Sequence, residues 1–329
     1  MRWVGMLSLV SILESFGGGD SLAQEASISD RHRSPVFVSY DQGRRWQSVG
    51  AGVLPPAQAS FLRRLGGQIV LATDDAGLFM SELPAASWLQ IGAALPGRKI
   101  SALEVSGNEI YVSVFRHGAF VSDDRGQHWR VLDEAFKDRT VQSILKRERD
   151  LFLGVDSGIF RKRVGEGGWI KVFQGPQVVS LIPLQNRVIA ASVGGVLRSD
   201  ESATGWDWVH REGALHGLTV QGNDVFALYI SGDLFVSRDQ GLTWFELEYA
   251  PRHGSYIYGL SRAGSESGYV MSNNYGVHRS KDGQNWQLEV AQEDLAFFDF
   301  LVYEDRLYAG ARTWQERRGR SLLGVEYPN

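Results

Sequence analysis

The sequence SRDQGLTW at Ser237–Trp244 decides the fold, because full or altered copies of it recur along the chain. Its last letter belongs to a ladder of seven tryptophans, whose successive members are 42, 41, 40, 39, 36 and 42 residues apart. These residues are Trp46, Trp88, Trp129, Trp169, Trp208, Trp244 and Trp286. A period of about 40 residues, combined with short strand-like runs, is typical of a β-propeller.

Two further features repeat in phase with the tryptophans. A polar turn is followed by a β-rich run, as in NEIYV at Asn108–Val112, and a glycine is then followed by apolar residues that begin another strand. The glycine permits the positive φ that a tight hairpin needs. Each repeat is therefore predicted to supply four strands, which in one unit span residues 99–105, 109–114, 119–122 and 128–132. The repeated glycines are Gly77, Gly118, Gly158, Gly195, Gly232 and Gly276.

The two ends of the chain supply half repeats. The first tryptophan unit begins near Ser34 and holds only the last two strands of a repeat, whereas residues 296–302 and 306–311 resemble the first two. Pairing the halves removes the exposed sheet edges of an open array. We therefore predict an all-β fold: a seven-bladed β-propeller of four-stranded antiparallel blades, whose closing blade is shared between N- and C-terminal strands. Six or eight blades are the alternatives, and residues 34–329 are predicted to form a single domain.

The N-terminus has the pattern of a secretory signal peptide at residues 1–23. Arg2 supplies positive charge, Val4–Leu13 is apolar, and Ser21-Leu22-Ala23 places small residues before a cleavage point. We expect residues 24–33 to be a flexible N-terminal segment, and the protein to be secreted or periplasmic in a bacterium. A disordered or helical N-terminal extension is the alternative. We predict no transmembrane segment elsewhere.

Composition excludes several kinds of chemistry. The 329 residues include no cysteine, so disulfides, thiolate metal sites and cysteine nucleophiles are excluded. The formal net charge of -4 gives no electrostatic reason to expect nucleic acid as a partner. The seven histidines lie far apart in the sequence without the pair spacing of a metal site. We predict no cofactor and no metal, and we expect a monomer.

Four of the tryptophan units share more than their last residue. They read SYDQGRRW at Ser39–Trp46, SDDRGQHW at Ser122–Trp129, SRDQGLTW at Ser237–Trp244 and SKDGQNW at Ser280–Trp286. These closely resemble the Asp-box, or BNR repeat, Ser-x-Asp-x-Gly-x-Thr-Trp. The units that end at Trp88, Trp169 and Trp208 are degenerate.

The resemblance implies a structural role for these units. In Asp-box families the motif is a turn between the two outer strands, on the face away from the active site. A role of the aspartates as cation ligands or catalytic carboxylates is the alternative. The residues to which we assign the structural role are Ser39, Asp41, Gly43, Trp46, Ser122, Asp124, Gly126, Trp129, Ser237, Asp239, Gly241, Thr243, Trp244, Ser280, Asp282, Gly283 and Trp286.

The families with this motif do not share one chemistry. They include sialidases, xyloglucan-degrading glycosidases, sortilin-type receptors and photosystem II assembly factors, so the resemblance implies the fold and leaves the activity open. A sialidase requires three arginines on one carboxylate and usually shows Phe/Tyr-Arg-Ile-Pro before its first Asp-box. Here that region reads RHRSPVF at Arg31–Phe37, which does not match. We predict no catalytic residues; if the protein is an enzyme, we expect a glycoside hydrolase.

Binding is expected at one rim of the channel, where propellers present their loops. The candidate rim residues combine arginine with aromatic side chains, a composition typical of interface anchors. The leading hypothesis is an exported, non-enzymatic propeller that binds a protein or peptide. The alternatives are a glycan-active protein, either a divergent sialidase-like glycosidase or a carbohydrate-binding module, and an ordinary solvated surface. The candidate residues are Arg116, His117, Arg252, His253, Tyr256, Asn274, Tyr275, Arg312, Trp314 and Arg317.

Overall fold

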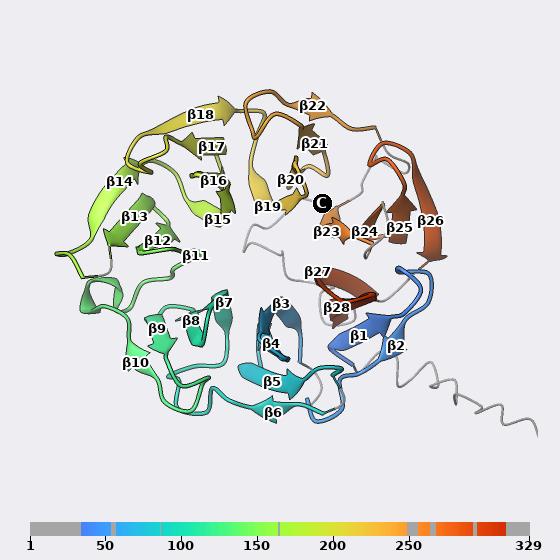
Figure 1. Cartoon of the computed structure of the whole chain (residues 1–329), viewed down its shortest axis with the longest axis horizontal. Coiled ribbons are helices and arrows are strands. Elements are labelled where there is room, and N and C mark those ends of the chain that lie inside the picture. The colour runs from blue at the N-terminus through green and yellow to red at the C-terminus, as the bar shows by residue number, and fades with distance from the viewer. Residues whose placement is uncertain are drawn as a thin grey trace, which may run out of the picture.

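The chain forms a seven-bladed β-propeller. The computed structural model describes residues 34–53, 57–85, 87–163, 165–248, 256–263, 268–291 and 295–313. Within these ranges seven sheets of four antiparallel strands are arranged in a ring around a central axis (Figure 1). The predicted fold class is therefore confirmed, and the alternatives of six or eight blades are wrong.

We number the blades from the first sheet that is built from consecutive strands, and give each from the central axis outwards. Blade one holds β3 (Ala59–Leu65), β4 (Gln68–Thr73), β5 (Leu78–Glu82) and β6 (Leu89–Gln90). Blade two holds β7 (Ile100–Ser106), β8 (Glu109–Val114), β9 (Gly118–Ser122) and β10 (Arg130–Val131), and is followed by the 3-10 helix Glu134–Phe136. Blade three holds β11 (Ser143–Arg147), β12 (Asp150–Val155), β13 (Gly158–Arg163) and β14 (Ile170–Gln174).

The remaining blades follow the same plan. Blade four holds β15 (Val178–Leu184), β16 (Arg187–Ser192), β17 (Gly195–Ser199) and β18 (Trp206–His210). Blade five holds β19 (Leu215–Gln221), β20 (Asp224–Tyr229), β21 (Leu234–Ser237) and β22 (Phe245–Glu246). Blade six holds β23 (Ile257–Arg262), β24 (Tyr269–Asn273), β25 (Gly276–Ser280) and β26 (Trp286–Ala291). The closing blade holds β27 (Leu295–Tyr303), β28 (Arg306–Thr313), β1 (Val36–Ser39) and β2 (Gln47–Ser48).

The closing blade joins the two ends of the described chain, as the half repeats predicted. Its strand order is β2-β1-β28-β27, and β1 pairs with β28 from Val36↔Gly310 to Ser39↔Leu307. The ring therefore closes by hydrogen bonding between strands, without a disulfide.

The hydrophobic core lies between neighbouring blades. Leu78 of blade one, for example, shares a buried cluster with Ile100 and Val112 of blade two, and Trp129 packs against that cluster. Each of the seven inter-blade clusters takes one member of the tryptophan ladder. The spacing of the ladder thus follows from the need to cover every blade boundary with one large ring.

The innermost strands share a β-bulge. In six blades the register shifts near the start of the innermost strand: after its first residue in five of them, as between Leu215 and Gly217 in β19, and after Phe297 in β27. A bulge re-aims the side chain of the extra residue. In these six blades the extra residues are Ser60, Ser101, Val179, His216, Tyr258 and Phe298.

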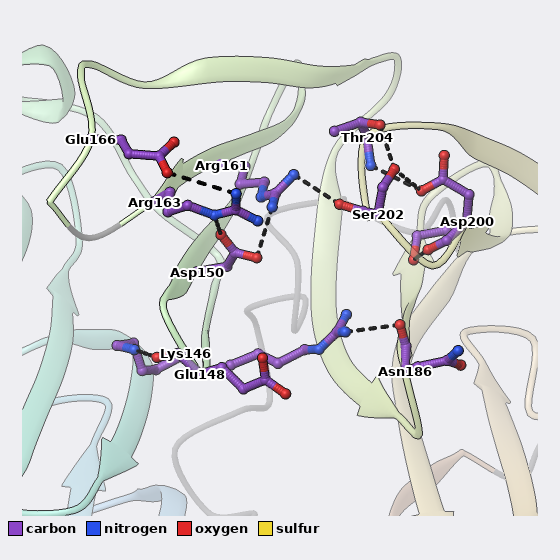
Figure 2. Close-up of polar contacts among 12 residues, drawn as sticks. Lys146, Glu148, Asp150, Arg161, Arg163, Glu166, Asn186, Asp200, Ser202 and Thr204 are labelled. Carbon is purple, nitrogen blue, oxygen red and sulfur yellow. Dashed lines mark hydrogen bonds and ion pairs between the residues drawn. The ribbon is translucent and has the colours of Figure 1, made fainter.

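Arginines also connect neighbouring blades. Between blades three and four, Arg161 donates from Nη2 to Asp150 at 2.8 Å and from Nη1 to the carbonyl oxygen of Ser202 at 2.8 Å (Figure 2). The turn that contains Ser202 is closed by Asp200, whose Oδ1 accepts the Thr204 N–H at 3.1 Å. This degenerate unit therefore keeps a carboxylate-closed turn, although its sequence has lost the repeat spacing.

Candidate functional site

The loops of each blade divide between two faces of the ring. The turn that follows the second strand is hydrogen-bonded to the segment that enters the first strand of the same blade. Phe115 N–H donates to Lys99 O at 2.9 Å, and Ile230 N–H donates to Ala214 O at 2.9 Å. We call the face formed by these turns and links the rim face. The tryptophan units connect the third and fourth strands, so antiparallel topology places them on the opposite face, which we call the turn face.

Four rings form a continuous series on the rim face, and we call them the rim aromatic row: His216, Tyr256, Tyr258 and Phe298. Successive ring centroids are 4.9 Å, 5.2 Å and 4.7 Å apart in that order. The row runs from blade five through blade six to the closing blade. Three of its members are the bulge residues near the starts of their innermost strands, where a bulge re-aims the extra side chain, and the middle ring, Tyr258, is buried.

Arg312 extends the row toward blade one. Its guanidinium carbon lies 4.3 Å from the centroid of Phe298, and its Nε donates to Ala59 O at 2.6 Å. Its Nη2 donates to Ser60 Oγ, and its Nη1 lies 3.5 Å from Asp74 Oδ2. The guanidinium therefore connects the closing blade to blade one.

A second group of cations lies over an aromatic ring in blade two. Lys99 Nζ lies 3.7 Å from Asp74 Oδ1 and 4.7 Å from the centroid of Phe115. The guanidinium carbon of Arg116 lies 5.2 Å from the same centroid, and the Arg116 N–H donates to Thr140 Oγ1 at 3.1 Å. Asp74 thus links this group to Arg312, and aromatic and cationic side chains follow one another across five blades.

The rim aromatic row contains one histidine, and its charge depends on its surroundings. Burial lowers the pKa of His216 from 6.5 to about 4. Its imidazole is therefore neutral at pH 7, and a positively charged partner group meets no repulsion from this ring.

The turn between β24 and β25 adds an amide and an exposed ring beside the row. Asn274 Oδ1 accepts the Tyr256 N–H at 2.8 Å, which fixes the start of the innermost strand of blade six. Tyr275, the next residue in that turn, is 40% exposed. The turn and the row thus lie together on the rim face, where Tyr275 presents an exposed ring.

The structure brings together part of the predicted rim set. Tyr256, Asn274, Tyr275 and Arg312 lie in blade six and the closing blade, as one sector. Arg116 and His117 lie in blade two and connect to that sector through Phe115, Lys99 and Asp74. The other predicted rim residues, Arg252, His253, Trp314 and Arg317, lie outside the described residues.

Three members of the row are absent from the predicted set, namely His216, Tyr258 and Phe298. No motif marks them, because the bulge position holds a different residue in almost every blade. Their shared signal is position alone: each is the extra residue near the start of an innermost strand. Superposing the repeats on one another at that position would have found them.

The four tryptophan units that share the longer motif have one hydrogen-bonding pattern. In the unit at Ser237–Trp244, Ser237 Oγ donates to Asp239 Oδ1 at 2.8 Å and accepts the Gly241 N–H at 2.7 Å. Trp244 Nε1 donates to Gly241 O at 3.2 Å. The other three units repeat these bonds, with serine–aspartate distances of 2.9, 2.8 and 3.0 Å.

The carboxylates of these units are engaged within their own turns. Hydrogen bonds from the backbone N–H groups of Asn285 and Gln284 hold the pKa of Asp282 well below its usual range. The backbone N–H and side chain of His128 do the same for the pKa of Asp124. Across the described ranges, no group of three or more His, Asp or Glu side chains has the arrangement needed to hold a metal ion.

Comparison with known proteins identifies the fold and nothing narrower. No family model and no curated protein matches the sequence. Similar solved structures include the extracellular domain of BT4673 from B. thetaiotaomicron, with a TM-score of 0.64 at 13% identity over 83% of this chain. They also include YCF48 bound to D1 peptide, with a TM-score of 0.60 at 16% identity over 77% of this chain. A third is the GH74 enzyme of Niastella koreensis, with a TM-score of 0.56 at 12% identity over 70% of this chain.

This chain is similar in fold to known β-propellers. It spans 40% of the BT4673 chain and 37% of the GH74 chain, but 91% of the YCF48 chain. At these identities the likeness concerns the fold alone. Within the part of the chain that the structure describes, no helix is long and apolar enough to cross a membrane.

Proposed function

We propose that this protein is an exported, non-enzymatic β-propeller that binds a protein or peptide through its rim face. The observation that carries the proposal is the rim aromatic row, continued by Arg312 into blade one. Aromatic and arginine side chains carry much of the binding energy at protein interfaces, and the aromatic ones bury large areas at a small cost in conformational entropy.

The geometry of the cations supports this function. Arg312 rests on Phe298, and both Lys99 and Arg116 approach Phe115. Cations held over rings lose little further freedom when a partner binds, so the surface is preorganised. A propeller of comparable length, YCF48, has been solved with a bound D1 peptide. That structure supports a single propeller as a sufficient scaffold for peptide binding.

A glycan-active protein is the second candidate, and one observation favours it. The exposed ring of Tyr275 adjoins the carboxamide of Asn274, and the C–H face of a sugar stacks on such a ring while an amide bonds its hydroxyls. In contrast, Arg63 pairs with Asp299 at 2.6 Å and Arg312 faces Ala59, Ser60 and Asp74. Both guanidiniums are thus engaged by the protein, which weighs against a carboxylate-binding sialidase site.

We further propose that the four tryptophan units are Asp-boxes with a structural role and that residues 1–23 direct export. The closed hydrogen-bonding pattern of the four turns supports the first statement. The charged, apolar and small-residue regions of the N-terminal sequence support the second.

Site-specific photo-crosslinking tests the choice of face. Benzoylphenylalanine is placed at position 275 or 116 on the rim face, and at position 242 on the turn face, in cells that produce the protein. We expect adducts of defined mass from position 275, and none from position 242, where the native leucine is 54% exposed. Adducts from position 242 alone would contradict the proposal. Hydrolysis of a fluorogenic sialoside or of xyloglucan by the purified protein would contradict its non-enzymatic part.

A further inference from the structure

A buried polar pair lies directly beneath the exposed turn of blade six. Asn273, which ends β24, is 1% exposed, and His278 in β25 is 0% exposed. Asn273 Oδ1 accepts the N–H of Tyr275 at 2.9 Å and the N–H of Gly276 at 3.2 Å. It also lies 3.0 Å from His278 Nε2. One side-chain oxygen thus holds both the turn and the histidine.

The hydrogen bonds fix which atoms carry protons. Two backbone N–H groups donate to the same atom of Asn273, so that atom is the carboxamide oxygen. His278 Nε2 must then carry a hydrogen and donate it. Burial lowers the pKa of His278 from 6.5 to about 4, so the ring is neutral at pH 7 and its Nδ1 carries no hydrogen. Among the described residues this buried Nδ1 has no hydrogen-bond partner.

The other blades place an apolar side chain where blade six has His278. The equivalent position lies in the third strand of each blade, counted outwards. It is two residues before the residue that matches Ser280, which is a lysine in blade three and a serine in the other blades. These residues are Phe37, Phe79, Phe120, Phe160, Leu197 and Phe235. Burying an imidazole with an unpaired nitrogen costs free energy that phenylalanine does not.

Asn273 ends its strand with a side chain that accepts hydrogen bonds from the following turn, as Thr73 and Ser192 also do. The residues that end the second strand in the other blades are Thr73, Val114, Val155, Ser192 and Tyr229, with Ala311 opposite the bulge in the closing blade. The backbone of the blade-six turn is constrained as well: Gly276 has φ of 139°, and a Cβ on it would overlap the carbonyl oxygen of Val290. Blade six therefore differs in the buried histidine that contacts this turn-bonding side chain, at a turn that carries an exposed aromatic ring beside the rim aromatic row.

We propose that Asn273 and His278 are positioning residues that hold Asn274 and Tyr275 against Tyr256, and that this turn is the primary contact of the rim face. The proposal rests on the rim-face function given above and names its centre. A local departure from the repeat pattern that lowers stability is expected where function requires a particular geometry. Blade six shows such a departure, whereas the turn of blade two, with Arg116 and His117, has an apolar Phe120 beneath it.

Hydrogen–deuterium exchange tests the positioning role without any partner. His278→Phe restores the residue type of the other blades and removes the donor. We expect the melting temperature to be kept or raised, while exchange at the amides of Tyr275 and Gly276 accelerates by about tenfold or more. His278→Gln keeps an N–H donor on that side, and we expect slow exchange to be retained. Leu197→Met, at the equivalent position of blade four, is the matched control and should leave these amides unchanged.

Photo-crosslinking from position 275 tests the functional part. In the His278→Phe background we expect the yield of the parent adduct to fall by about tenfold, and in the His278→Gln background to be retained. Unchanged exchange at Tyr275 and Gly276 in His278→Phe would overturn the positioning role, even if crosslinking persists. Absence of adducts from the parent protein, with accelerated exchange in His278→Phe, would overturn the rim-face function instead. If His278→Phe does not fold, rapid exchange in folded His278→Gln would still overturn the proposal.

Discussion

Arg63 of blade one and Asp299 of the closing blade form an ion pair across the boundary where the ring closes. The distance from Arg63 Nη1 to Asp299 Oδ2 is 2.6 Å, and the same carboxylate oxygen accepts the Leu62 N–H at 2.9 Å. That N–H belongs to an innermost strand with no further strand beside it. One side chain therefore satisfies a sheet edge and joins two blades, although Leu62 and Asp299 are 237 residues apart in the sequence.

Removing this carboxylate should weaken the closure. We expect Asp299→Ala to lower the free energy of unfolding by about 1–3 kcal/mol, because a partly buried N–H and a guanidinium lose their acceptor. Urea denaturation followed by tryptophan fluorescence measures the change. Asp123→Ala is the control. It removes an exposed carboxylate from the tryptophan unit of blade two and should cost less than about 0.5 kcal/mol. Equal effects of the two variants would contradict a special role for the closing pair.

Glu104 in β7 should make stability depend on pH in an unusual direction. Burial raises the pKa of Glu104 from 4.5 to about 7, although Arg63 opposes the shift. Between these values the folded protein binds more protons at this site than the unfolded chain, so its contribution to stability falls as pH rises. We expect Glu104→Gln to be more stable than the parent by about 1–3 kcal/mol at pH 8, with the difference shrinking below pH 5. A difference independent of pH would contradict the raised pKa.

His278 should have the opposite dependence on pH. Its pKa in the folded protein is lowered from 6.5 to about 4, so the unfolded chain binds more protons between these values and stability is lost as pH falls. We expect His278→Phe to flatten the acid side of the stability profile by up to about 3 kcal/mol. Denaturant titrations at pH 7, 5.5 and 4 measure it. A parallel acid loss in parent and variant would show that His278 does not titrate in this range.

The tryptophan units should contribute stability through packing. Trp244 donates to Gly241 O at 3.2 Å and packs against the cluster that contains Leu218 and Val225. Because the ring is only half-buried, we expect Trp244→Ala to cost about 2–4 kcal/mol, somewhat less than a fully buried ring. Leu242→Ala in the same turn should be nearly neutral, since Leu242 is 54% exposed. A neutral Trp244→Ala would contradict the role of the ladder at blade boundaries.

Much of the fold could be predicted because the same residue type, tryptophan, packs at every boundary between blades. A tryptophan at each boundary and a glycine at each hairpin recur visibly, so the number of blades and the shared closing blade follow from spacing. The outermost strands could be predicted less well. The strand expected at residues 128–132 is reduced to Arg130–Val131, because the Asp124 carboxylate draws His128 N–H into the turn at 2.9 Å.

The candidate site could be predicted only in part. Arg312 was expected at the rim, but its partners Asp74 and Ser60 are 238 and 252 residues away in the sequence, so no local pattern indicates them. The bulge positions use residue types as different as Ser60, His216 and Phe298. A backbone irregularity, and no shared side chain, places them at equivalent positions near the starts of their innermost strands.

The shared closing blade also sets an order of events in time. Strand β1 is among the first strands to be synthesised, yet its sheet partner β28 begins only at Arg306, after the strands of blades one to six. Contacts so distant in sequence form slowly, since a large loop must close before any bond is gained. Blades one to six can each assemble as their own strands emerge, whereas β1 and β2 must wait for β28 before they join a four-stranded sheet. Closure therefore follows the synthesis of blades one to six, and a chain truncated before β28 would remain an open arc with two exposed edges.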